Sequence, residues 1–140
     1  MTISRKTLGF IVNPIAGMGG AVGLKGTDGK DIVRKAISLG AKPVAPARAE
    51  VFLSKITSAK SKFSLLVGAA LMGEYEAKKV GLKFRVIGEE KSETTAEDTK
   101  ATAQAMTNEG ATLLVFCGGD GTARDILDAI DMKVPVLGVP

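Results

Sequence analysis

The sequence contains no histidine and no tryptophan, only one cysteine and one tyrosine, and its aromatic content is 4%. The absence of histidine excludes imidazole both as a general base and as a metal ligand. A general base in this chain must therefore be a carboxylate, a lysine or a tyrosine. The single cysteine, Cys117, cannot form a disulfide within the chain, which is typical of a reducing compartment. Because no histidine can activate its thiol, we expect Cys117 to be a small buried residue rather than a nucleophile.

Long apolar runs are also missing. No stretch of about 18 apolar residues occurs, and the N-terminal run is too short for a signal peptide and has no small-residue cleavage site. We therefore expect a cytoplasmic protein with no membrane partner. The few aromatic residues do not lie in basic clusters with RNA-binding spacing, so nucleic acid is not expected as a partner either.

The charge is distributed unevenly along the chain. Residues 1–85 carry 15 Lys and Arg against 5 Asp and Glu, a net charge of +10. Residues 86–140 carry 4 against 10, a net charge of −6. A basic first part suits a polyanionic ligand such as a nucleotide. Solvated helix faces explain the same pattern, and we favour that explanation for most of these lysines.

Apolar runs alternate with amphipathic ones through all 140 residues, a length that suits one domain with a buried core. The pattern predicts strands at 8–12, 63–67, 83–87, 112–117 and 134–139, a short extended piece at 43–45, and helices at 30–39, 48–60, 73–80, 95–109 and 122–131. In the helix at 48–60 we expect Val51, Phe52 and Ile56 to face inward. Strands that alternate with helices predict an α/β fold of three layers, with a parallel sheet between helices. Ligands of such folds bind beyond the carboxyl ends of the strands.

The most informative stretch is Gly118-Gly119-Asp120-Gly121-Thr122, between an expected strand and an expected helix. Its three glycines let the backbone approach a ligand closely, and the N–H groups at the start of a helix favour phosphate. Asp120 is the one acid in this turn and is suited to act as a base or a metal ligand. The alternative is that Asp120 only caps the helix.

A second glycine-rich loop follows the first expected strand. It begins with Asn13 and contains Gly17, Gly19 and Gly20, but it matches neither the Walker A pattern nor the dinucleotide fingerprint. A backbone cradle with Asn13 at its mouth and a flexible surface loop remain equal interpretations of this loop by itself.

The clearest helix of the chain opens with two threonines. Thr94 with Glu97, or Thr95 with Asp98, forms a capping-box pattern, and Gly110 closes the helix. This segment also follows a strand, so it is either an ordinary helix cap or a further ligand-contacting loop.

Together these motifs resemble a known superfamily. The stretch from Gly118 to Thr122 after a strand is similar to the hallmark of the superfamily that includes NAD kinases, diacylglycerol kinases and sphingosine kinases. The segments 13–29 and 94–99 resemble the ATP–NAD kinase branch that includes the acetoin-catabolism protein AcoX. The resemblance runs from about residue 8 to the end, and it implies a Rossmann-like nucleotide-binding N-terminal domain.

The resemblance also implies roles for the matching residues. Asp120 would be the catalytic carboxylate, which helps to deprotonate the acceptor hydroxyl or orients metal-bound phosphates. The remaining residues would bind nucleotide: Gly118, Gly119, Gly121 and Thr122 along the phosphates, and Asn13, Gly17, Gly19, Gly20, Thr94 and Thr95 from neighbouring loops. The expected cofactors are ATP, NAD and Mg²⁺, with the metal beside the phosphates.

The implied function is a phosphotransferase that moves phosphate from ATP or polyphosphate to the 2′-hydroxyl of NAD and so makes NADP. A kinase for a lipid or another small alcohol, and a nucleotide-sensing domain without catalysis, are the alternatives. In this superfamily a second, β-rich domain follows and supplies much of the acceptor site. We therefore expect residues 1–140 to be an N-terminal domain that is inactive alone and part of a homo-oligomer in the full-length protein.

Overall fold

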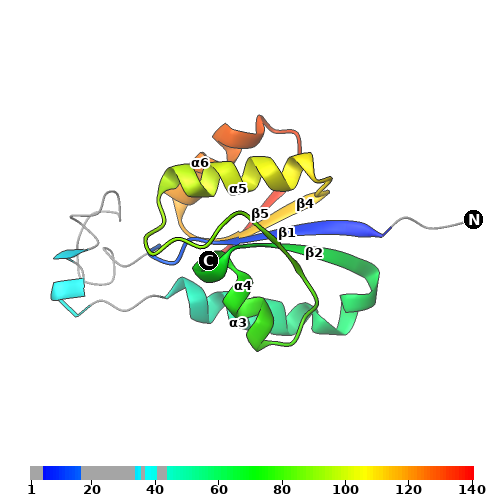
Figure 1. Ribbon diagram of the computed structural model, residues 1–140, viewed down its shortest axis with the longest axis horizontal. Coiled ribbons are helices and arrows are strands. Elements are labelled where there is room, and N and C mark those ends of the chain that lie inside the picture. Colours follow the sequence, from blue (N-terminus) through cyan, green and yellow to red (C-terminus); the bar gives the residue numbers. More distant parts are fainter. Residues whose placement is uncertain (1–4, 17–33, 36, 41–43) are drawn as a thin grey trace, which may run out of the picture.

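The computed structural model describes residues 5–16, 34–35, 37–40 and 44–140 as one parallel β-sheet with helices on both faces (Figure 1). The five strands lie in the order β3-β2-β1-β4-β5, and every neighbouring pair is parallel. This confirms the predicted three-layer α/β fold. The strands are β1 (Lys6–Val12), β2 (Phe63–Gly68), β3 (Arg85–Ile87), β4 (Leu113–Cys117) and β5 (Val136–Val139). The helices are α3 (Ala45–Ile56), α4 (Glu74–Lys79), α5 (Ala96–Asn108) and α6 (Asp120–Ile130), with 3₁₀ turns at Thr57–Lys62 and Ala70–Met72.

The strand β1 shows how alternating side chains build the two core layers. Phe10 and Val12 belong to the layer under α3 and α4, whereas Ile11 belongs to the layer under α5 and α6. The Phe10 ring stacks on the ring of Phe52 from α3, with 5.7 Å between the ring centroids. Both core layers are buried because helices cover both faces of the parallel sheet.

The main departure from the predicted elements concerns α3. The expected extended piece at 43–45 is wrong at its described residues, because Val44 has helical dihedrals and the helix begins at Ala45. Pro46 favours this early start, since proline lacks an N–H group that the first turn would leave unpaired anyway.

The prediction of which residues of α3 face inward was wrong for Val51. Val51 is 58% exposed, and the fully buried positions are Ala49 and Leu53. The buried positions Ala45, Ala49 and Leu53 are four residues apart and share one face of the helix. At 3.6 residues per turn, Val51 lies about 200° around the axis from Ala49 and so falls on the outer side. Phe52 and Ile56 pack against the core as expected.

Other boundaries moved by about two residues. Strands β3 and β5 begin at Arg85 and Val136, later than expected, and α6 begins at Asp120, earlier than expected. Of the helix expected at 30–39, residues 30–33 and 36 lie outside the described residues. Residues 34–35 and 37–38 are helical, as expected, and 39–40 form a turn.

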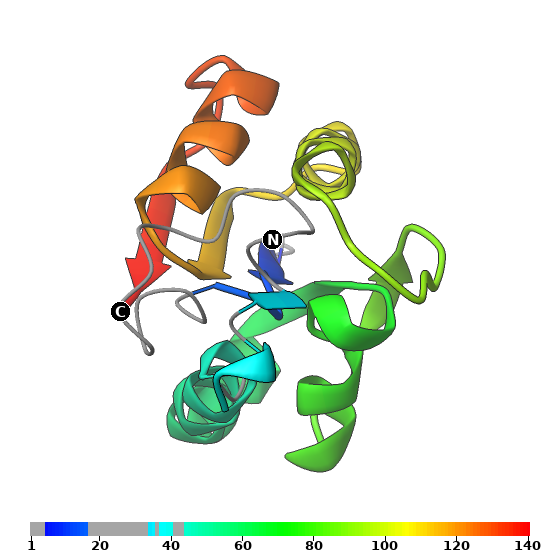
Figure 2. The ribbon, with the colours of Figure 1, turned by 90° about the vertical axis from the view of Figure 1, so that its left-hand side faces the viewer.

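Helices α3, α4, α5 and α6 all start at one edge of the sheet, since each runs back against the strand before it. Figure 2 looks onto this edge, where the strands end and the turns that lead into the helices face the viewer. In the part of the chain that the structure describes, no helix is long and apolar enough to cross a membrane.

Candidate functional site

The site lies where β1 and β4 end side by side. Val12 pairs with Cys117 in the last step of the register, and the Asn13 N–H donates to the Cys117 carbonyl at 2.9 Å. After β1 the chain adds β2 and β3 on one side of β1, and it then crosses over to add β4 and β5 on the other side. The direction in which strands are added therefore reverses between β1 and β4. In open parallel sheets the crevice that binds ligands forms at this reversal. The glycine-rich loop that begins at Asn13 and the glycine turn that begins at Gly118 therefore start next to each other.

One side-chain hydrogen bond joins these two loops. The Asn13 amide Nδ2 donates to the Thr122 hydroxyl Oγ1 at 2.9 Å, across 109 residues of sequence. The Asn13 side-chain oxygen accepts from the Ile15 N–H at 3.3 Å, and Thr122 is only 4% exposed. Both side chains thus hold the loops in place. Neither lines the cleft described below, and their predicted contacts with nucleotide stay predictions.

The turn from Gly118 to Thr122 begins α6. Its N-cap is Gly119, which has extended dihedrals and no side chain to cap with, and Asp120 is the first helical residue. The alternative that Asp120 merely caps the helix is therefore wrong. A Cβ on Gly118 would lie 2.6 Å from Thr122 Oγ1, whereas a Cβ on Gly119 would meet no atom of the described residues within 4 Å. Gly118 is needed by the packing of the protein itself, and Gly119 leaves open space for a ligand.

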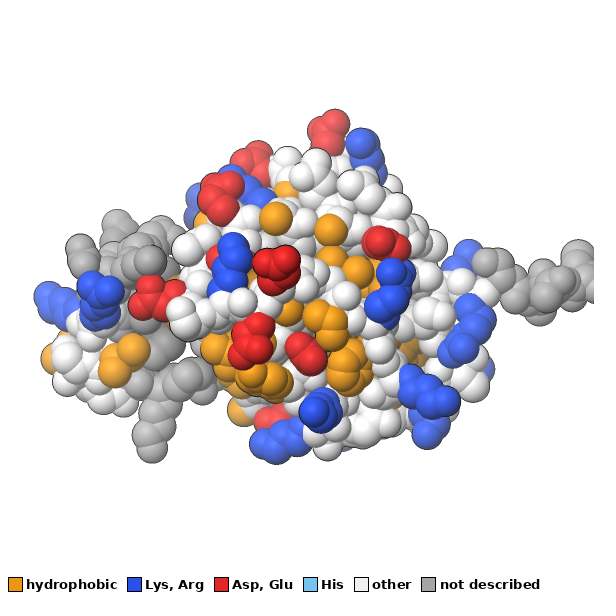
Figure 3. Space-filling model, in the orientation of Figure 1, with side chains coloured by type: hydrophobic (Ala, Val, Ile, Leu, Met, Phe, Trp, Pro, Cys, Tyr) orange, Lys and Arg blue, Asp and Glu red, His pale blue; other side chains and the backbone are white. Residues whose placement is uncertain are grey.

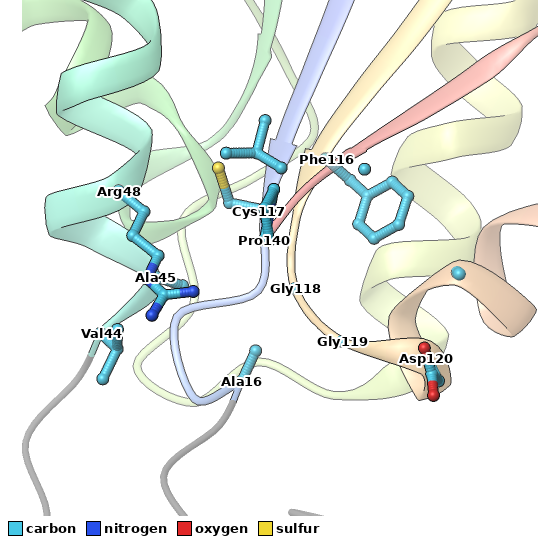
Figure 4. Close-up of a pocket in the computed structure, with 13 residues that line it drawn as sticks. Ala16, Val44, Ala45, Arg48, Phe116, Cys117, Gly118, Gly119, Asp120 and Pro140 are labelled. Atoms are coloured by element: carbon cyan, nitrogen blue, oxygen red, sulfur yellow. The ribbon is translucent and has the colours of Figure 1, made fainter. Parts of the chain in front are cut away.

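An open cleft of about 730 Å³ lies at this edge (Figure 4). This volume falls in the range of about 300–1,000 Å³ that is usual for small-molecule sites. Its walls come from the first turn of α3, the end of β4 with the glycine turn, and the end of β5. The lining residues are Ala16, Val44, Ala45, Arg48, Phe116, Cys117, Gly118, Gly119, Asp120, Ala123, Gly138, Val139 and Pro140.

Two charged side chains line the described cleft, one on each side. Figure 4 shows Asp120 at the start of α6 and Arg48 projecting from α3 on the opposite wall, with Cys117 and Gly118 between them. Asp120 is exposed and has no hydrogen-bond or ion-pair partner among the described residues. A carboxylate without a partner among the described residues is available to a ligand.

Cys117 forms part of the cleft floor as a neutral thiol. It is 1% exposed, and burial raises its pKa to about 12, with a further rise from the negative charge of Glu76 and an opposing effect from Arg48. A thiol with this pKa is not ionised near neutral pH and is a poor nucleophile. The expectation of a small buried residue is confirmed.

The threonines that open α5 lie at the same edge of the sheet. The Thr95 N–H donates to Asp98 Oδ2 at 2.8 Å, and the Asp98 N–H donates to Thr95 Oγ1 at 3.4 Å, so the capping box uses Thr95 and Asp98. A hydrogen bond from Lys91 is the main reason that the pKa of Asp98 is lowered. Thr94 and Thr95 do not line the described cleft. The cap interpretation is confirmed for Thr95, and a nucleotide contact stays a prediction.

Sequence reasoning missed Arg48 as a site residue. The helix was expected to begin at residue 48, whereas it begins at Ala45 and places Arg48 at the end of its first turn, beside the cleft. Pro46 is the signal that could have located this start. The predicted ligands Gly17, Gly19 and Gly20 lie outside the described residues, and Gly121 follows Asp120 as an exposed residue of α6.

The fold and this cleft define the class: a doubly wound α/β domain whose glycine turn opens a helix at the point where the strand order reverses. The chain matches the family model of the ATP-NAD kinase N-terminal domain over residues 8–140 and belongs to that family. Membership of this family indicates kinase activity of the NAD kinase type. Searches of curated proteins and of solved structures found no match to the chain.

Proposed function

We propose that this protein transfers phosphate from ATP or polyphosphate to the 2′-hydroxyl of NAD and so makes NADP. The observation that carries the proposal is the position of Asp120, a carboxylate without a protein partner among the described residues, beside Gly118 and Gly119 in the cleft of an ATP–NAD kinase family domain. We also assign the chain to the branch that includes AcoX, because segments 13–29 and 94–99 resemble it.

In the proposed reaction, Asp120 accepts the proton of the acceptor hydroxyl while the hydroxyl oxygen forms a bond to the terminal phosphorus of the donor. The bond between that phosphorus and the bridging oxygen breaks, and the shortened donor leaves. The chain contributes mainly position and charge, as is usual in phosphoryl transfer. The open backbone at Gly119 and the first N–H groups of α6 support this proposal, since both suit phosphate groups.

The residues present fit a magnesium ion that arrives with the nucleotide. Within the described ranges no group of three or more Asp, Glu, Cys or His side chains could hold a metal ion. Mg²⁺ commonly binds through one or two carboxylates together with phosphate oxygens and water, and Asp120 is the carboxylate of the described cleft. When bound, the ion would neutralise charge that develops on the phosphate oxygens.

The test is formation of NADP by the full-length protein with Mg²⁺, NAD, and ATP or polyphosphate, measured with a coupled dehydrogenase. We expect Asp120→Asn to lower kcat by about 10² to 10⁴, the usual contribution of a general base, without unfolding the protein. Asp131→Asn is the matched control, since Asp131 ends the same helix about 16 Å further along its axis.

A folded full-length protein that makes no NADP with any of these donors would refute the proposal. Supplying a diacylglycerol or a small alcohol in the same assay identifies a kinase with another acceptor. Nucleotide binding without turnover of any acceptor identifies a sensing domain.

A further inference from the structure

Arg48 is the cation that lines the described cleft. Figure 4 shows its side chain extending from α3 toward the middle of the cleft. It is exposed, and it makes no side-chain hydrogen bond or ion pair with another described residue. The acid nearest to it along α3, Glu50, pairs with Lys79 of α4 at 3.1 Å. The guanidinium therefore remains available to an anion in the cleft.

The charge of Arg48 acts at the floor of the cleft. Its positive charge opposes the rise in the pKa of the Cys117 thiol, so the guanidinium lies within electrostatic reach of the last residue of β4. Gly118 and Gly119 follow directly. The first turns of α3 and α6 also line the cleft and add the partial positive charge of their unpaired N–H groups. The wall around Arg48 therefore favours an anion.

We propose that Arg48 binds a phosphate group that is not transferred, either of the phosphoryl donor or of the dinucleotide acceptor. This rests on the proposed function. The transferred group must lie beside Asp120, and Arg48 projects from the opposite wall, so it meets a different phosphate. A guanidinium offers two parallel N–H groups to phosphate oxygens, which makes the contact strong and directional. Arg48 is thus a positioning residue that holds the nucleotide before and after transfer.

The experiment measures dissociation constants by calorimetry for adenosine, ADP, ATP and NAD with the purified protein. We expect Arg48→Ala to weaken the binding of ADP and ATP, or of NAD, by about tenfold or more, while the affinity for adenosine stays unchanged. The ligand that loses affinity shows whether the phosphate comes from the donor or the acceptor. Arg48→Lys should recover part of the lost affinity, because lysine keeps the positive charge but lacks the two parallel N–H groups of the guanidinium.

Lys55→Ala is the matched control. Lys55 is an exposed cation on the same helix, about 10 Å further along its axis and outside the cleft. It should leave every dissociation constant unchanged. Circular dichroism and thermal denaturation verify that each variant is folded.

The inference is overturned if Arg48→Ala binds all four ligands as the unchanged protein does, or if adenosine loses as much affinity as the phosphorylated ligands. If the unchanged protein makes NADP in these cases, the proposed function stands and only the role of Arg48 fails. If the unchanged protein binds none of the ligands and makes no NADP, both proposals fail together.

Discussion

Asp120 and Glu76 are two carboxylates in opposite surroundings. Asp120 is exposed at the cleft, whereas Glu76 on α4 is 5% exposed, and its Oε2 has no hydrogen-bond partner among the described residues. Burial is the main reason that the pKa of Glu76 is raised, and the nearby Glu50 raises it further, while its own backbone N–H and Lys79 lower it. The Asp120 carboxylate is accessible to a ligand, whereas ionisation of Glu76 destabilises the folded state.

The raised pKa of Glu76 predicts that the stability of the protein depends on pH. An acid with a raised pKa in the folded state binds its proton more tightly there, so the free energy of unfolding falls as the pH rises through the unfolded value of about 4.5 toward the folded one. Glu76→Gln should therefore stabilise the protein by about 1–2 kcal/mol at pH 8 and have little effect at pH 4. Urea denaturation at the two pH values measures this difference.

Glu97→Gln is the control for that measurement, since Glu97 has an 83% exposed side chain and only a 4.0 Å contact with Lys100. It should change stability little at either pH. A loss of stability in Glu76→Gln at pH 8, or an equal gain at both pH values, contradicts the explanation by burial.

At the scale of elements, the decisive feature is the turn that joins β4 to α6. It is held by the hydrogen bond between Asn13 and Thr122, and Thr122 leaves no room for a side chain at Gly118. The same turn faces the open cleft through Gly119 and Asp120. Two adjacent glycines thus serve different needs, one of internal packing and one of access.

Substitution by alanine separates these needs. Gly118→Ala should destabilise the protein by about 1–3 kcal/mol, because the new Cβ would lie 2.8 Å from the Cβ of the buried Thr122. Gly119→Ala should change stability by no more than about 1 kcal/mol but weaken nucleotide binding about tenfold, since its Cβ would occupy space that a phosphate needs. Thermal denaturation and calorimetry on both variants give the comparison. Unchanged affinity in folded Gly119→Ala would show that no ligand approaches this backbone.

At the scale of the whole molecule, several of the described basic side chains lie away from the cleft. In Figure 3 basic side chains gather at the right-hand end, which is the edge where the strands begin. Lys6 begins β1, Lys60 and Lys62 precede β2, and Arg85 begins β3. For these residues a solvated surface is the better explanation of the basic first part of the chain. Arg48 is the basic side chain that lines the described cleft.

The cleft combines α3, the end of β4 and the end of β5, so it exists only in the folded state. A nucleotide that binds there must stabilise the entire domain by linkage, by about 2.7 kcal/mol at a concentration one hundred times its Kd. Urea denaturation with and without ADP and Mg²⁺ tests this, with sodium sulfate at equal ionic strength as the control. An ADP effect no larger than that of sulfate would argue against a nucleotide site.

The elements with strong local signals were predictable from sequence. Alternating apolar runs located all five strands, and the Thr95 capping box and Gly110, with its positive φ of 96°, marked the ends of α5. The glycine turn at Gly118 was predictable because its glycines follow an apolar run directly and precede a helical pattern, although the bond from Asn13 that holds it was not. Helix α3 was harder to place, since its buried face consists mostly of alanines, which carry little hydrophobic signal.

The order and kind of the elements, and the position of Asp120 in a glycine turn after a strand, follow from local patterns along the chain. The packing of distant elements establishes that Asn13 bonds to Thr122, that Arg48 and Asp120 line opposite sides of a cleft, and that one oxygen of buried Glu76 has no partner among the described residues. Turns and helix caps depend on residues a few positions apart, whereas the surroundings of a side chain depend on which distant strands and helices pack beside it.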